Sequence, residues 1–184
     1  MDAGQERFKR LYDTHYRAIV GYFMRRLDHT GSAVDLTEDV FLVAWDKLDQ
    51  VPNAEHELYW LYGVARRVLA NHRRKVTRRW RITSRIGSED AGPQPVLDQV
   101  ISHTNAEGVH EALENLRTRD QELIRLAYWE ELPHAVIADM SGCSRAAVDV
   151  RLHRAVRRLG KELEQSPHFS GEALPPAAAK ERPC

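Results

Sequence analysis

Arginine and lysine side chains gather in two separate stretches of this 184-residue chain. Residues 60–85 contain no carboxylate, and their cations are Arg66, Arg67, Arg73, Arg74, Lys75, Arg78, Arg79, Arg81 and Arg85. The second stretch holds a single carboxylate, Asp149, among Arg145, Arg151, Arg154, Arg157, Arg158 and Lys161. Basic surfaces of this density attract polyanions, chiefly nucleic acid. The alternative is a pair of solvated helix faces, which two such stretches in one chain make less favoured.

Aromatic residues stand at the start of the first basic stretch. Tyr59, Trp60 and Tyr62 come just before its arginines. Rings beside a cationic track suit single-stranded nucleic acid, because stacking contributes roughly 1–3 kcal/mol per base while the cations hold phosphates. Aromatic rings are also common core residues. We therefore expect some of these rings to pack in the interior and others to face nucleic acid.

The second basic stretch has the parts of a helix-turn-helix. A short helix is expected from Pro133 to about Ser141, with Gly142 in a turn that favours a positive backbone dihedral. Ser144 is expected to cap the next helix, whose apolar stripe consists of Val148, Leu152, Ala155 and Leu159. In such motifs the start of the second helix enters the DNA major groove, where arginine is the commonest base-contacting residue. An ordinary helical bundle with a basic exterior is the alternative.

Helical periodicity runs through nearly the whole chain, and no stretch alternates for long enough to indicate a strand. A first amphipathic helix is expected from about Phe8 to Leu27, ending at Gly31-Ser32. Further helices are expected over about 35–48 and 57–79, and again from residue 106. Two of them are expected to open on capping boxes, formed by Asp35 with Glu38 and by Thr118 with Gln121.

The expected helix over residues 35–48 is apolar on two sides. One side carries Leu36, Val40 and Val43, the other carries Phe41, Trp45 and Leu48, and acidic residues surround both. A helix with two apolar sides either lies in the core or docks a partner. A protein partner with basic, partly apolar helices would suit it, and a central core helix fits the pattern equally well.

We therefore expect an all-α chain with two small helical domains joined by a flexible acidic linker. The expected bounds are 1–83 for the first domain, 84–105 for the linker, 106–165 for the helix-turn-helix domain and 166–184 for a disordered tail. The longest apolar run, Phe41–Trp45, is far below the ~20 residues that cross a membrane, and no signal peptide is recognised. The two cysteines cannot form a disulfide framework, so a cytoplasmic setting is expected.

Catalytic patterns are missing from the sequence. The nine histidines are scattered, and the chain contains no His-Glu-x-x-His pattern, phosphate-binding loop or dinucleotide fingerprint. We therefore expect a protein that is not an enzyme and that needs no metal and no cofactor.

Three segments together resemble a known family. They are Asp35–Trp45, Trp60–Arg74 and Ile137–Ala155. Their order and spacing, with the linker between them, are similar to those of the small extracytoplasmic-function (ECF) sigma factors of bacterial RNA polymerase, over about residues 8–163. The resemblance implies a sigma region 2 domain, a linker that threads the polymerase cleft and a region 4 helix-turn-helix domain.

The resemblance also implies functional residues and partners. Contacts with the clamp helices of the beta-prime subunit of core RNA polymerase are implied for Asp35, Leu36, Glu38, Asp39, Val40, Phe41 and Trp45. Recognition and melting of the minus-ten promoter element are implied for Asn53, Trp60, Arg66, Arg67, Asn71, Arg73 and Arg74. Recognition of the minus-thirty-five element is implied for Ser144, Arg145, Ala147, Val148, Arg151, Arg154 and Arg158. An anti-sigma factor is a further expected partner, although some family members are controlled by synthesis or by a C-terminal extension. No membrane is expected among the partners.

The chain departs from the family pattern inside the helix-turn-helix. Ser141 replaces the usual leucine before the turn glycine, and Asp149 replaces a usual cation. An acid there disfavours phosphate contact, or it accepts a hydrogen bond from a cytosine amine. The rival interpretation is a stand-alone helix-turn-helix regulator, which would bind duplex DNA without polymerase. An adaptor for a helical partner would explain the second helix but neither basic stretch.

Overall fold

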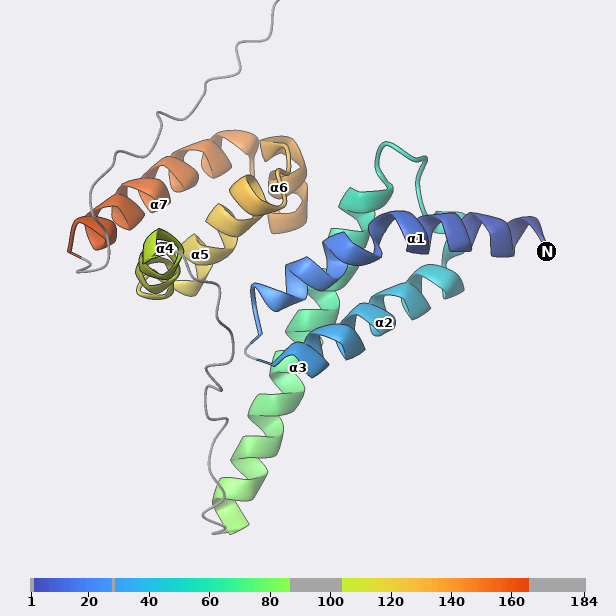
Figure 1. Cartoon of the computed structure of the whole chain (residues 1–184), viewed down its shortest axis with the longest axis horizontal. Coiled ribbons are helices and arrows are strands. Elements are labelled where there is room, and N and C mark those ends of the chain that lie inside the picture. Colours follow the sequence, from blue (N-terminus) through green and yellow to red (C-terminus); the bar gives the residue numbers. More distant parts are fainter. Residues whose placement is uncertain (1, 28, 87–103, 166–184) are drawn as a thin grey trace, which may run out of the picture. The chain divides into compact units, whose positions relative to one another are not determined.

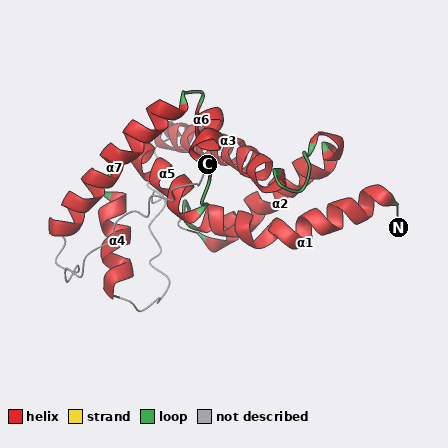
Figure 2. Ribbon diagram, turned by 90° about the horizontal axis from the view of Figure 1, so that it is seen from above, coloured by secondary structure: helices red, strands yellow, loops and turns green. Residues whose placement is uncertain are grey.

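The structure is a computed structural model that describes residues 2–27, 29–86 and 104–165. The chain divides into two compact units, Met1–Gln99 and Val100–Cys184. The regular elements of the described residues are all helical, which confirms the expected all-α class with two helical domains (Figure 2). Most of the expected linker, and the expected tail, lie outside the described residues.

The described residues of the first unit form three long helices and a short 3-10 turn (Figure 1). They are α1 (Ala3–Met24), α2 (Thr30–Asp46), η1 (Leu48–Gln50) and α3 (Glu57–Ile86). Each long helix buries one face: α1 contributes Ile19, Tyr22 and Phe23, and α3 contributes Leu61 and Ala65, among others. From Ala70 to Arg81 the side chains of α3 are mostly exposed, and Figure 1 shows this half of the helix running on beyond α1 and α2.

The loop before α3 is fixed by polar contacts from α1. The guanidinium of Arg7 donates a hydrogen bond to the carbonyl oxygen of Val51 at 2.7 Å. Further along, the ring of His15 lies 3.3 Å from a carboxylate oxygen of Glu57, and both side chains are only 12% exposed. These contacts position both the start of α3 and the loop that holds Asn53.

The boundary between the first two helices differs from the expected one. The turn lies between Met24 and Thr30, so Gly31 and Ser32 belong to α2, and Asp35 lies inside it and caps nothing. The physical reason is burial: Ala33 is fully buried, so the packed face of α2 begins before Asp35. Packing does not require a glycine in this first turn, because a Cβ at Gly31 would meet open space.

The second unit consists of α4 (Thr104–Glu114), α5 (Thr118–Ile124), a π-helical turn η2 (Arg125–Trp129), α6 (His134–Ser141) and α7 (Arg145–Gln165). Its core is built around α7. Leu152 and Ala155 of this helix pack with Leu113, Leu116 and Ile124. The described part of this unit is therefore a small helical domain in which one face of α7 is buried and the other is free to carry charge.

Two helices of this unit start one residue away from the expected position, and the expected capping box of Thr118 is absent. Thr118 is the first residue of α5 and not its cap, and no side chain caps this helix. Gln121 instead donates its side-chain amide to the carbonyl oxygens of Glu114 and Leu116, at 3.0 and 2.9 Å. It thereby satisfies carbonyls at the end of α4 that lack helical partners. Similarly, Pro133 precedes α6 as its N-cap residue, and the helix begins at His134.

Candidate nucleic-acid interfaces

The turn between α6 and α7 has the expected geometry. Gly142 adopts a left-handed conformation with φ of 63°, and the amide of Cys143 donates to the carbonyl oxygen of Ala138 at 3.1 Å. The hydroxyl oxygen of Ser144 accepts a hydrogen bond from the amide of Ala147 at 3.2 Å. The glycine turn and the serine cap are thus confirmed as structural features, and together they fix the direction in which α7 leaves the turn.

The first turns of α7 separate core residues from exposed ones. Val148 is only 1% exposed and packs into the core, so its predicted DNA contact is corrected to a structural role. Arg145, Arg151 and Arg154 are exposed, and Ala147 is partly exposed. The reason is helical geometry, since residues that follow Val148 by four and seven positions share its buried face.

The arginines of α7 differ in whether they form an ion pair with a carboxylate. Arg158 donates to a carboxylate oxygen of Asp120 on α5 at 2.5 Å. Arg145, Arg151, Arg154 and Arg157 have no hydrogen-bond or ion-pair partner among the described residues. Arg158 therefore helps to join α5 to α7, whereas the other four are available for an external anion.

Asp149 has a partner within its own unit. Its carboxylate oxygen lies 2.5 Å from the Nδ1 atom of His134, the first residue of α6. Both side chains remain substantially exposed, at 49% and 38%. The acid that interrupts the basic stretch of α7 is thus bonded to the neighbouring helix.

Along α3, most of the predicted minus-ten residues are exposed. Trp60 is partly buried, and Arg66, Arg67, Asn71, Arg73 and Arg74 are exposed. Helical spacing places Arg67, Asn71 and Arg74 on the same side of the helix as Trp60. Tyr62 is 3% exposed and packs against Tyr22, so of the aromatic residues expected to divide between two roles, Tyr62 is in the core.

Several of these polar side chains form hydrogen bonds within the first unit. The guanidinium of Arg74 donates to the side-chain oxygen of Asn71 at 2.6 Å, and Arg73 reaches the carbonyl oxygen of Arg26 at 3.5 Å. In the preceding loop, the side-chain oxygen of Asn53 lies 3.0 Å from Nδ1 of His56. Arg67 has no such partner among the residues described.

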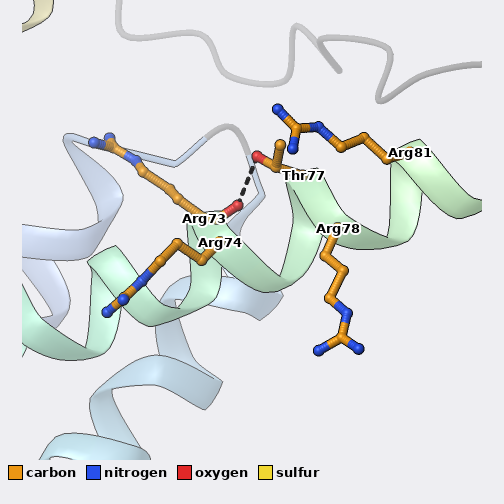
Figure 3. A pocket seen from close by; sticks show the side chains of 5 residues that line it. All are labelled: Arg73, Arg74, Thr77, Arg78 and Arg81. Carbon is orange, nitrogen blue, oxygen red and sulfur yellow. Dashed lines mark hydrogen bonds between the residues drawn. The ribbon is translucent and has the colours of Figure 1, made fainter.

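A surface pocket lies on the outer half of α3 (Figure 3). It is lined by Arg73, Arg74, Thr77, Arg78 and Arg81. Figure 3 shows Arg73 and Arg81 on the same side as Thr77, whose hydroxyl donates to the carbonyl oxygen of Arg73 at 2.9 Å. Arg74 and Arg78 extend along the other side. This half of α3 therefore presents cations on two sides, as a groove or strand of phosphates requires.

The second helix, α2, exposes a different set of residues from the predicted one. Leu36, Val40 and Phe41 are at most 6% exposed and belong to the core, so they cannot contact a partner unless the unit opens. Phe41 lies against the ring of Tyr12, with 4.8 Å between ring centroids. Partial burial, and then the nearby Tyr16 hydroxyl, raises the pKa of Tyr12.

The outer face of α2 is acidic with an apolar centre. Its acids, Asp35, Glu38, Asp39 and Asp46, are all exposed. Between them lie Leu42, which is 66% exposed, and Trp45, which is 48% exposed and packs one edge against Phe8. Leu42 is missing from the predicted set, although its spacing from Asp35, Glu38 and Asp39 places it on their side of the helix.

Comparison with known proteins assigns both units to one family. Residues 11–79 match the family model Sigma-70 region 2, and residues 106–159 match Sigma-70, region 4. The RNA polymerase sigma factor YlaC of Bacillus subtilis is 30% identical over 161 residues, which cover 85% of this chain and 91% of that protein. The chain belongs to the ECF sigma factors. This family comprises non-catalytic initiation factors for promoter-directed transcription by RNA polymerase.

Other relatives of the sigma factor agree with this assignment. The ECF RNA polymerase sigma factor SigL of Mycobacterium tuberculosis is 28% identical over 159 residues, covering 84% of this chain and 88% of SigL. The fold is similar to that of the sigma factor RpoE of Bartonella quintana, solved in complex with the anti-sigma factor NepR, with a TM-score of 0.67. That match has 22% sequence identity and covers 85% of this chain and 96% of RpoE.

The sigma factor has exposed residues on α3 that the predicted minus-ten set does not include. Trp80 is 59% exposed and Val76 is 41% exposed, and Arg78 and Arg81 line the pocket of Figure 3. The expected helix ended at residue 79, as does the region 2 match, whereas α3 continues to Ile86. The signal was available, because no glycine or proline occurs between Gly63 and Gly87.

Neither a membrane span nor a metal cluster is found in the described part of the sigma factor. No helix there is long and apolar enough to cross a membrane. The histidines, cysteines and carboxylates of the same residues form no group of three that could hold a metal ion.

Proposed function

We propose that this sigma factor binds core RNA polymerase through the outer face of α2 and recognises promoter DNA through α3 and α7. In this proposal α3 recognises and helps to melt the minus-ten element. The start of α7 enters the major groove at the minus-thirty-five element. The observation that carries the proposal is the set of exposed α7 arginines without a partner among the described residues. They follow a capped helix start, which is the position of base contacts in helix-turn-helix proteins.

The polymerase contact is proposed for Asp35, Glu38, Asp39, Leu42 and Trp45. The exposed Leu42 and Trp45 supply an apolar centre, and the surrounding acids supply charge for a basic partner helix. Contacts of this kind derive their affinity from a desolvated apolar centre and their partner selectivity from the charged rim. The same apolar surface favours a covering partner when polymerase is absent, and we infer that an anti-sigma factor fills this role, as NepR is bound to RpoE of Bartonella quintana.

At the minus-ten element, Trp60 is proposed to stack on an unpaired base, with Arg67, Asn71 and Arg74 along the same side of α3. At the minus-thirty-five element, Arg145 and Arg151 are proposed to contact bases and Arg154 to contact phosphate. Asn53 keeps its proposed contact with an unpaired base through its side-chain NH₂ group, because its oxygen faces His56. Ser144 and Ala147 lie at the helix start, where backbone amides hold a phosphate.

A reconstituted transcription reaction tests the proposal. Core RNA polymerase from a bacterium that carries this chain is given fragmented genomic DNA, with and without the sigma factor, and the 5′ ends of the transcripts are sequenced. We expect new transcripts that start at a fixed distance from two shared upstream elements. Binding of the protein alone to a duplex site, with no new transcripts in the presence of core polymerase, would instead identify a stand-alone regulator.

A further inference from the structure

Val150 is an exposed apolar side chain in the recognition helix α7. Half of its surface is open to solvent, whereas Val148 and Leu152, two residues to either side, are 1% and 6% exposed. Residues two positions apart lie about 200° apart around a helix, so Val150 points away from the core of its unit. It therefore contributes little to the packing that holds the unit together.

The surroundings of Val150 leave it accessible to a groove. Ala146, one turn earlier, and Arg154, one turn later, lie on the same side of α7, and both are exposed. Ala146 is too small to cover its neighbour. Arg151 and Arg154 have no partner among the described residues, so they remain available beside the valine for the proposed base and phosphate contacts.

Asp149 does not compete for this position. Its carboxylate oxygen is 2.5 Å from Nδ1 of His134, which directs the acid toward the start of α6. This hydrogen bond leaves Val150 as the side chain that occupies the centre of the exposed face in the first two turns of α7. A valine neither donates nor accepts a hydrogen bond, so its only favourable contact with a base edge is apolar.

We propose that Val150 is a specificity-determining residue that recognises thymine in the minus-thirty-five element through the C5-methyl group. In the major groove only thymine carries such a methyl group, and small apolar side chains are its usual protein contacts. This inference rests on the proposed function, because it assumes that α7 lies in the major groove of promoter DNA. It adds the class of base that the helix selects and assigns Asp149 to positioning against α6.

Uracil substitution tests the contact directly. The holoenzyme is assayed on promoters in which single upstream thymines are replaced by uracil, which removes the methyl group and keeps the base pair. We expect the wild-type protein to lose about fourfold in transcript yield at one or two positions, the factor for burial of one methyl-sized group. The Val150→Ala variant, whose side chain ends at Cβ, should lose most of this difference between the thymine and uracil promoters.

A matched control is the Val76→Ala variant, which makes the same change at another exposed helix position and should retain the full response to uracil. Equal wild-type yields from thymine and uracil at every upstream position, on promoters that still depend on the sigma factor, would overturn the inference alone. Loss of preference at a guanine–cytosine pair in Asp149→Asn, with an unchanged uracil response in Val150→Ala, would also overturn it. Failure to transcribe any promoter would count against the proposed function instead.

Discussion

Residues of one type take different roles according to their partners. Arg154 and Arg158 are one turn apart on α7, and both belong to the residues implied for minus-thirty-five recognition. Phosphate contact is proposed for Arg154. In the structure Arg158 donates to Asp120, whose side chain is only 14% exposed, whereas Arg154 has no partner among the described residues. The phosphate role is therefore retained for Arg154, and Arg158 is assigned to holding α5 against α7.

The two arginines should respond differently to salt. Arg154→Ala should reduce by about one unit the slope of log affinity against log salt concentration for promoter binding by the holoenzyme, because one counterion fewer is released. Arg158→Ala should leave that slope unchanged and lower the free energy of unfolding by up to about 1 kcal/mol. Filter binding over a range of salt concentrations measures the slope. A reduced slope in Arg158→Ala would return this residue to the DNA-contacting set.

At the level of secondary-structure elements, packing against neighbouring helices decides which side of a helix is exposed to a partner. The pattern of α2 allows two apolar sides, and its packing against α1 and α3 buries Phe41 at 2% exposure while leaving Leu42 at 66%. These adjacent residues are both large and apolar, and they lie about 100° apart around the helix. Their substitution should therefore have opposite consequences for folding and for polymerase binding.

Phe41→Ala should lower the free energy of unfolding by about 3–5 kcal/mol, because it leaves a cavity in a packed aromatic cluster. Leu42→Ala should leave the unfolding midpoint nearly unchanged and weaken the association with core RNA polymerase. Urea unfolding and a polymerase pull-down measure the two effects. Normal holoenzyme assembly by the folded Leu42→Ala variant would exclude Leu42 from the polymerase contact.

The turn of the helix-turn-helix depends on one glycine conformation. Gly142 has φ of 63°, and nothing lies within 4 Å of a Cβ built there. Gly142→Ala should therefore cost about 1–2 kcal/mol of unfolding free energy from the backbone alone. Gly31→Ala is the matched control, because that site is equally open and has no positive φ, and it should be neutral or stabilising. Equal unfolding midpoints for the two variants would contradict the backbone explanation.

For the molecule as a whole, the proposed function divides promoter recognition between the two units. The region 2 match lies in one unit and the region 4 match in the other. Among the described residues, Trp60 belongs to the first unit and Arg154 to the second. Substitutions in the two units should therefore affect different steps of initiation.

Trp60→Ala should reduce promoter opening more than initial binding, because stacking stabilises the unpaired strand. Arg154→Ala should reduce initial binding, with the fraction of bound complexes that open unchanged. Permanganate reactivity of unpaired thymines measures opening, and gel retardation measures binding. If thymines are as reactive in Trp60→Ala complexes as in wild-type complexes, Trp60 has only a packing role.

Features that involve near neighbours in the chain follow from the amino-acid sequence alone. Helical periodicity, the turn at Gly142 and the cap by Ser144 could be predicted, because each involves residues within a few positions of one another. The charge segregation predicted two modules, and the resemblance carried by the order and spacing of the motifs predicted the family. The position of the last turn of α3 was missed, although the sequence contains no residue that would end the helix before Gly87.

Burial within an amphipathic pattern and the pairing of charges follow instead from how the helices pack against one another. Burial of Phe41 instead of Leu42 depends on where α1 and α3 pack, which periodicity in α2 alone leaves open. The pairs Asp149 with His134 and Arg158 with Asp120 join residues on different helices, 15 and 38 positions apart. A charge remains free for DNA only when no neighbouring helix supplies a counter-charge, and that depends on how the helices pack together.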